Sequence, residues 1–218
     1  MQPSEYIHLS YPVPYHAQIA SPELATQIFE QGMDPCLDPR WAESGANTPE
    51  EYAYWVERAC GAACVQMCVE ALGGISRTLV DWANLGVQNG GYLIKQENDS
   101  RIEYGWIHKS LADLICHEGF KATAQPADLD GIIQFICQDQ LVIASVSYET
   151  GTPFPITKKS GHLIVIHGIQ LTDGIPQKLI VHNPSGRTLD MQANARIPVD
   201  RFESGYSGRI IVAGKLIH

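Results

Sequence analysis

The residues best suited to chemistry lie between Arg58 and Gly74, where a cysteine opens a predicted buried helix. From Cys60 onward the side chains are small or apolar, and Gly73 with Gly74 supplies a C-terminal stop. A thiol in the first helical turn faces unpaired backbone N–H groups and the positive end of the helix dipole, which favour the thiolate and lower the pKa of the cysteine. The sequence therefore predicts a sulfur nucleophile at Cys60.

Two further cysteines, Cys64 and Cys68, follow Cys60 at intervals of four and share its predicted helix face. Both lie deeper in the apolar run, where a cysteine usually behaves as a small buried hydrophobe. Zinc would need a second pair of ligands that converge tetrahedrally, which three thiols along one helix face do not readily supply. We therefore expect one reactive cysteine, no metal ligands and no cofactor.

Two β-branched runs later in the chain indicate strands that carry an imidazole and an amide. The first run begins at Gly161 with His162, and the second ends at Asn183. A short hairpin at Thr172-Asp173-Gly174 would join the two strands and bring both side chains to one edge of a sheet. The order of candidate groups along the chain is cysteine, histidine, asparagine.

These three motifs together resemble those of the papain-like cysteine peptidases related to bacteriocin-processing, double-glycine-leader peptidases. The family pattern is a Cys-Gly-x-Ala-Cys helix start, a Gly-His-x-x-Val-x-x-Gly strand and an Asp-Pro or Asn-Pro turn, matched here by Cys60–Cys64, Gly161–Gly168 and Asn183-Pro184. The resemblance implies an α+β, papain-like fold in which a catalytic helix packs against an antiparallel sheet. It also implies Cys60 as nucleophile, His162 as general base and acid, and Asn183 as the group that orients the imidazole.

The sequence departs from the family pattern in two places. Asn183 stands where the leader peptidases have aspartate, and no glutamine for the oxyanion hole occurs between Glu50 and Ala59. The segment Val13–Gln18 resembles the one that carries this glutamine in the family, displaced upstream by an insertion. Gln18 is thus the candidate donor to a substrate oxyanion beside the Cys60 backbone N–H, with an exposed loop glutamine as the equal alternative.

The residue types imply covalent catalysis through an acyl-enzyme. His162 would accept the Cys60 proton, the thiolate would attack a carbonyl, and Asn183 would fix the imidazole tautomer. His167 and His182 are alternative bases, but strand alternation places them on the opposite faces from His162 and Asn183. We expect a cysteine peptidase or amidase acting on a peptide or amide substrate. A thiol acyltransferase or transglutaminase-like enzyme and a non-catalytic peptide-binding relative are the alternatives.

Length and composition predict one domain with three parts. The 218 residues suffice for one substantial core. Residues 1–46 are rich in proline and predict an extended arm that packs on the catalytic helix, residues 47–140 a mainly helical part, and residues 141–218 the antiparallel sheet. Helices are expected over Glu50–Arg58, Arg77–Leu85, Trp106–Glu118 and Asp128–Cys137, with a long surface loop over Gly86–Gly105.

Charge and hydropathy exclude several classes of partner. The formal net charge is −9 with no block of lysine or arginine, which argues against nucleic acid and slightly favours a cationic peptide. No apolar run approaches the length of a membrane span, and the first residues lack a secretory pattern, so we expect a cytoplasmic protein. The leader peptidases are commonly fused to an exporter, and without a phosphate-binding loop this chain is expected to act alone or with a separate transporter.

Overall fold

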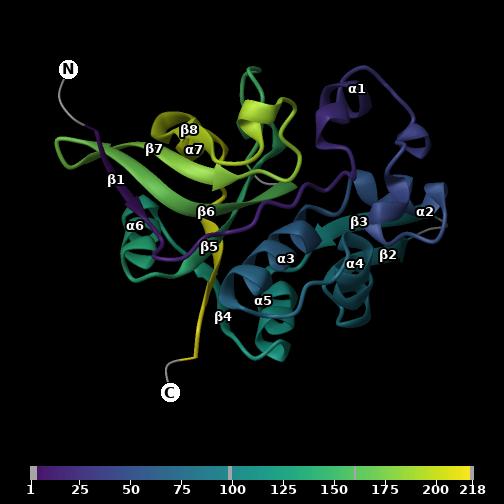
Figure 1. The fold of residues 1–218 in the computed structure, drawn as a ribbon, viewed down its shortest axis with the longest axis horizontal. Coiled ribbons are helices and arrows are strands. Elements are labelled where there is room, and N and C mark those ends of the chain that lie inside the picture. The colour runs from purple at the N-terminus through teal and green to yellow at the C-terminus, as the bar shows by residue number, and fades with distance from the viewer. Residues whose placement is uncertain (1–3, 98–99, 160, 217–218) are drawn as a thin grey trace.

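This computed structural model describes residues 4–97, 100–159 and 161–216. Within these residues, seven strands form the main sheet. The strands run antiparallel in the order β4-β9-β5-β6-β7-β8, and β1 pairs with β6 beyond the end of β5 (Figure 1). They are β1 (Glu5–His8), β4 (Lys121–Pro126), β5 (Leu141–Ser147), β6 (Gly161–Thr172), β7 (Ile175–His182), β8 (Ala195–Pro198) and β9 (Arg209–Gly214). Every residue of β5 is buried, as expected for a strand covered on both faces.

The α-helices pack around this sheet. They are α1 (Ala25–Phe29), α2 (Pro49–Val56), α3 (Cys60–Leu72), α4 (Leu79–Gln88), α5 (His108–His117), α6 (Leu129–Cys137) and α7 (Val199–Gly205). Helix α3 contacts β6, α5 contacts β4 and β9, and α6 and α7 both contact β5. The α+β class predicted from the sequence, with a helix packed on an antiparallel sheet, is confirmed. None of the helices in the described ranges is long and apolar enough to cross a bilayer.

Helix α3 begins at Cys60 and is almost completely buried. It ends at Gly73, whose φ of 97° is left-handed and therefore favours glycine at this position, as the sequence predicts. At its other end, a Cβ on Gly61 would lie 2.6 to 2.8 Å from ring atoms of Trp106. Only glycine lets this indole lie directly on the first turn of the helix.

The hairpin between β6 and β7 forms where the sequence predicts it. Thr172 ends β6, Ile175 begins β7, and the two residues between them, Asp173 and Gly174, have φ of 53° and 73°. Two consecutive left-handed residues are typical of the turn that suits the twist of antiparallel strands. Between this turn and the other end of the pair, the register shifts once between Gln170 and Leu171 and once between Ile166 and Gly168. His182 then lies opposite Val165, and Asn183 follows directly.

The surface loop expected over Gly86–Gly105 is wrong. Strands β2 (Tyr92–Glu97) and β3 (Ser100–Trp106) pair as a separate two-stranded sheet; Asn98 and Asp99 of the expected loop lie outside the described residues. The ring centroids of Tyr92 and Trp106 lie 5.0 Å apart, and both rings pack against Trp55 of α2. Aromatic packing against a distant helix thus outweighs the glycines and polar residues from which a loop was predicted.

The N-terminal segment joins both layers of the fold. Its strand β1 pairs with β6, and His16 Nε2 lies 2.7 Å from Glu70 Oε2 on α3, so the segment also contacts this helix. Strand β4, from the part of the chain expected to be mainly helical, pairs with β9 at the other side of the sheet. The main sheet therefore draws strands from all three parts of the chain distinguished in the sequence.

Candidate active site

Cys60 and His162 line one cavity of about 280 Å³ between α3 and the sheet. Cys60 reaches it from the first turn of α3, and His162 from the second residue of β6. The remaining lining residues come from the turn between α2 and α3, the β2–β3 hairpin, α5 and the neighbouring strands: Glu57, Arg58, Tyr92, Gly105, Trp106, His108, Ser145, Gly161 and Leu163. The fold therefore brings a thiol and an imidazole, 102 positions apart in the sequence numbering, to the same hollow.

Asn183 holds the His162 ring from the side of the sheet. Its Oδ1 lies 2.8 Å from His162 Nε2, in a buried position, so Nε2–H donates and Nδ1 is left as the ring's proton acceptor. Asn183 is fixed in turn: its backbone N donates to Gln192 O, and Tyr15 Oη donates to its backbone O. A Cβ on Gly151 would lie 2.2 Å from Asn183 Nδ2, so only glycine leaves room for the amide.

A second oxygen, which the sequence analysis did not identify, also lies beside the imidazole. Ser185 Oγ is 3.2 Å from His162 Nε2, and the Ser185 backbone N donates to Asn183 Oδ1 at 3.2 Å. Both side chains are buried. The turn Asn183-Pro184-Ser185 therefore presents two acceptors to one ring N–H. A serine two positions after the asparagine is the only local signal, and serine is too common in turns for it to be distinctive.

We predict that these two oxygens partly replace each other. Asn183→Ala should lower kcat/KM by about tenfold, because Ser185 Oγ can still accept from Nε2–H, and Ser185→Ala should lower it less. The double variant should lose more than the product of the two single losses, which a double-mutant cycle on kcat/KM measures. Simple multiplication of the two effects would contradict the shared role, and the unfolding midpoint of each variant is the control for folding.

Burial sets the resting charge of the thiol and the imidazole. It raises the pKa of the Cys60 thiol to about 11, although the backbone N–H groups of Leu163, Gly61 and Cys60 itself lower it. Burial also lowers the pKa of His162 to about 4, against the raising effect of Asn183, and the charge of Arg187 lowers it further. The lowered Cys60 pKa expected from the helix start is therefore wrong for this structure. Near pH 7 the pair rests as thiol and neutral imidazole.

Gln18 is buried rather than exposed, so the alternative of an exposed loop glutamine is wrong. Its Nε2 donates to Val56 O at 2.6 Å, and its backbone N donates to Pro184 O at 2.9 Å. It thus ties the N-terminal segment to the end of α2, four residues before Cys60, and to the turn after Asn183. Its Oε1 is buried with no hydrogen-bond partner, and Gln18 is not among the residues that line the Cys60 cavity.

The alternative bases, His167 and His182, lie away from this cavity. Their ring centroids are 4.3 Å apart, and both ring nitrogens of His182 meet backbone groups: Nε2 at Val13 O and Nδ1 at Asn194 N. The other two helix thiols, Cys64 and Cys68, are fully buried, and burial raises the pKa of each. Within the described ranges, no group of three or more His, Cys, Asp or Glu side chains could hold a metal ion.

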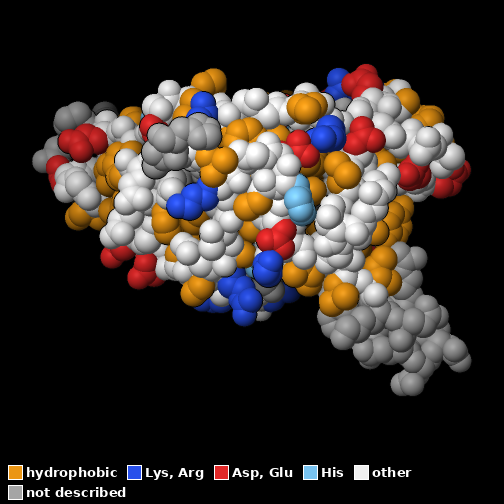
Figure 2. All heavy atoms as spheres, turned by 90° about the horizontal axis from the view of Figure 1, so that it is seen from below, with side chains coloured by type: hydrophobic (Ala, Val, Ile, Leu, Met, Phe, Trp, Pro, Cys, Tyr) orange, Lys and Arg blue, Asp and Glu red, His pale blue; other side chains and the backbone are white. Residues whose placement is uncertain are grey.

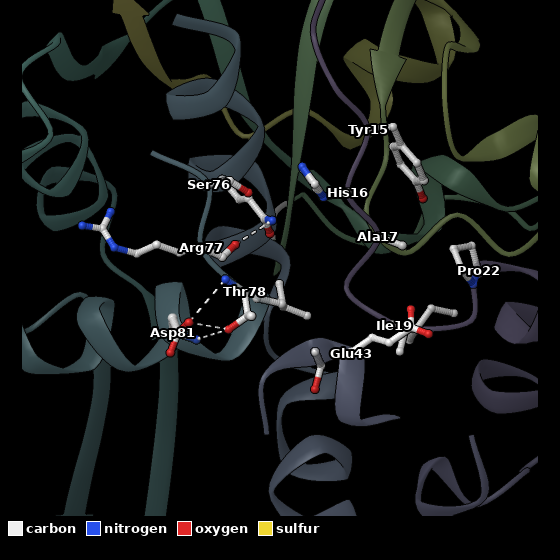
Figure 3. A pocket seen from close by; sticks show the side chains of 14 residues that line it. Tyr15, His16, Ala17, Ile19, Pro22, Glu43, Ser76, Arg77, Thr78 and Asp81 are labelled. Carbon is white, nitrogen blue, oxygen red and sulfur yellow. Dashed lines mark hydrogen bonds between the residues drawn. The ribbon is translucent and has the colours of Figure 1, made fainter. Parts of the chain in front are cut away.

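A larger cavity, of about 600 Å³, lies between the N-terminal segment and the start of α4 (Figure 3). Its walls are Tyr15–Pro22 of the N-terminal segment on one side and the start of α4 on the other, where Thr78 and Asp81 bond each other in a capping box. No cysteine lines it, and its histidine, His16, is bonded to Glu70. The smaller cavity is therefore the candidate active site.

No protein-family model and no curated protein sequence matches this chain. Among solved structures, one described as a C39-like peptidase from Bacillus anthracis matches with a TM-score of 0.52 and 17% sequence identity, over 74% of this chain and 90% of that one. The chain has the C39-like peptidase fold. The papain-like architecture implied by the resemblance to the leader peptidases is thereby confirmed.

Two further solved structures that match with lower TM-scores are of transporter-associated peptidases. The peptidase domain of Streptococcus ComA, a bi-functional ABC transporter involved in quorum sensing, matches with a TM-score of 0.48 and 17% identity, over 73% of this chain and 93% of that one. A double glycine motif protease from an AMS/PCAT transporter, in complex with the leader peptide, matches with a TM-score of 0.46 and 13% identity, over 72% and 84%.

Proposed function

We propose that this protein is a cysteine peptidase or amidase that acts through Cys60, His162 and Asn183 and forms an acyl-enzyme. The observation that supports this most strongly is the His162–Asn183 hydrogen bond of 2.8 Å, made through Nε2 by a ring that lines the same cavity as the thiol. This bond leaves Nδ1 as the proton acceptor. The C39-like fold, whose solved example is described as a peptidase, favours a peptide as the substrate.

The reaction begins from a neutral thiol, because burial raises the pKa of Cys60 and lowers that of His162. His162 Nδ1 takes the thiol proton as Cys60 Sγ attacks the carbonyl carbon of the substrate. The imidazolium, oriented by Asn183 Oδ1, then protonates the leaving amine, and a thioester remains on Cys60. Water, deprotonated by the same imidazole, attacks the thioester and releases the acid product together with the free thiol.

Charge develops on the carbonyl oxygen during each attack and needs preorganised donors. The backbone N–H groups in the first turn of α3 have no intrahelical acceptor, and Cys60 is the first residue of that turn. We assign the second donor to the Gln18 side chain, which has to turn towards the Cys60 cavity because it does not line that cavity in this structure. One of its two amide hydrogens is taken by Val56 O, so the other is free for a substrate oxygen.

The setting of the reaction is part of the same proposal. All six cysteines are unpaired, which suits a reducing compartment such as the cytoplasm. The substrate is a peptide, and a transporter that delivers or exports it is the proposed partner. No nucleic acid, cofactor or metal takes part.

We predict that the protein cleaves peptides and that the acyl-enzyme can be intercepted. Digestion of a synthetic peptide library, followed by mass spectrometry, should show new carboxyl termini in water. The corresponding hydroxamates should form when hydroxylamine is present, because hydroxylamine attacks the thioester on Cys60. Amide products formed with simple amines at the expense of hydrolysis would favour an acyltransferase. Absence of both cleavage and acyl-enzyme would leave a non-catalytic peptide-binding protein.

A further inference from the structure

A second cavity, of about 570 Å³, adjoins the one that contains Cys60. Trp106 and His108 line both cavities and so form a shared wall between them. The rest of the second cavity is built from the start of α5 and from the paired strands β4 and β9: Ile107, Lys109, Ala124, Gln125, Pro126, Arg209 and Ile210. We call it the Arg209 cavity. A peptide that reaches Cys60 past Trp106 would extend into it.

The charge of the Arg209 cavity is opposite to that of the whole protein. The chain has a formal net charge of −9, yet no aspartate or glutamate is among the residues that line this cavity. Its charged lining residues are Lys109 and Arg209, both basic. Figure 2 shows Lys and Arg side chains gathered near the lower edge of a view that looks at the molecule from the α5 side of Figure 1.

The two basic side chains differ in whether a partner already neutralises them. Lys109 Nζ lies 2.7 Å from Asp113 Oδ2, one turn along α5. The Arg209 side chain makes no ion pair or hydrogen bond with any other residue in the described ranges. The pKa of His108, in the shared wall, is lowered. The main cause is burial of the imidazole, and the positive charge of Arg209 is the second. Arg209 is therefore a cation that faces the cavity without a partner.

We propose that the Arg209 cavity is a substrate subsite that binds the carboxylate of an acidic side chain in the peptide. The inference rests on the proposed peptidase function and names its substrate class. A guanidinium binds a carboxylate through two parallel hydrogen bonds, which gives both affinity and direction. The negative net charge of the whole chain alone would favour a cationic peptide. The positive charge of the Arg209 cavity instead favours an acidic side chain at this subsite. At the other side of the shared wall, the catalytic cavity carries the exposed Glu57, which would repel a second acidic residue there.

Peptide electrophiles that alkylate Cys60 test this subsite directly. A series of otherwise identical peptides, each with a terminal chloromethyl ketone, would carry Glu, Gln or Lys at one of five successive positions. The rate of Cys60 alkylation would be followed by mass spectrometry. For at least one position we expect the Glu peptide to react about tenfold faster than the Gln peptide, and the advantage to shrink in high salt. Arg209→Gln should remove the difference, and Arg209→Glu should make the Lys peptide the faster one.

Arg196→Gln is the matched control, because Arg196 is an exposed arginine on β8, away from both cavities. It should leave the Glu preference unchanged, and a small neutral haloacetamide should alkylate Cys60 equally fast in all variants. Equal rates for Glu, Gln and Lys peptides at every position, or an undiminished Glu preference in Arg209→Gln, would overturn the subsite and leave the peptidase proposal standing. Alkylation of Cys60 by the haloacetamide but by none of the peptides would overturn the proposed function together with the subsite.

Discussion

Replacing Cys60 by alanine is expected to lower kcat/KM for peptide cleavage by about 10⁴-fold or more, because no other thiol lines the catalytic cavity in the described part of the chain. The fold should survive. The substitution deletes one sulfur atom from a side chain that is 9% exposed, which costs about 1 to 2 kcal/mol. Peptide hydrolysis followed by mass spectrometry measures the first effect, and thermal unfolding measures the second.

Cys64→Ala is the matched control for this substitution. Cys64 lies one turn further along α3, is fully buried, and loses the same sulfur atom. It should keep activity close to that of the parent protein while losing about 1 to 3 kcal/mol of stability, because a deeper cavity is left behind. If Cys60→Ala remained active and Cys64→Ala did not, in proteins that both fold, the nucleophile would be misassigned.

The parts of the site that could be predicted from the sequence are those fixed by local patterns. The apolar run and paired glycines around α3, the β-branched run that begins with His162, and the Asp173-Gly174 turn each depend on neighbouring residues. Once α3, β6 and β7 were predicted, the hairpin alone was enough to place His162 near Asn183. The prediction did not need the path of the rest of the chain.

The parts that could not be predicted depend on contacts between distant residues. Gly151 packs tightly against Asn183, and Gly61 against Trp106; the residues of each pair are more than thirty positions apart in the sequence. In the sequence alone, each glycine looks like an ordinary turn or helix residue. The aromatic packing that orders β2 and β3 is of the same kind. Local rules therefore predicted a loop where tertiary packing builds one wall of the cavity.

The charge state of Cys60 at rest could not be predicted either, because it too depends on contacts between distant residues. A helix start favours a thiolate by roughly 0.3 to 1 kcal/mol, whereas complete burial of a charge can shift a pKa by several units. Position in a helix can be read from sequence, but depth of burial cannot. In this structure burial prevails and raises the pKa of Cys60 to about 11, so in the proposed mechanism His162 has to remove the proton.

His162→Ala should therefore be the second most damaging substitution, with kcat/KM lower by about 10³-fold to 10⁴-fold at pH 7. The pH dependence should change as well. In the parent protein the base works whenever His162 is neutral, and because its pKa is lowered to about 4, activity should be flat from about pH 5 to 8 and fall near pH 4. In the variant, reaction depends on spontaneous thiolate. Because the Cys60 pKa is raised to about 11, the rate should rise about tenfold per pH unit up to about pH 10.

Acid unfolding must be separated from the titration of the base. Burial lowers the pKa of His162 to about 4 and of His167 to about 3, so the unfolded chain binds more protons than the folded one below pH 6.5. The stability these neutral rings contribute is complete above pH 6.5 and is lost as the pH falls towards 3. Unfolding midpoints at each pH identify the range in which activity reports on His162 alone. His167→Gln is the control, since His167 lies on the same strand but does not line the catalytic cavity. The His167→Gln variant should still lose activity near pH 4. A flat pH profile like that of the parent protein in His162→Ala would show that His162 is not the base.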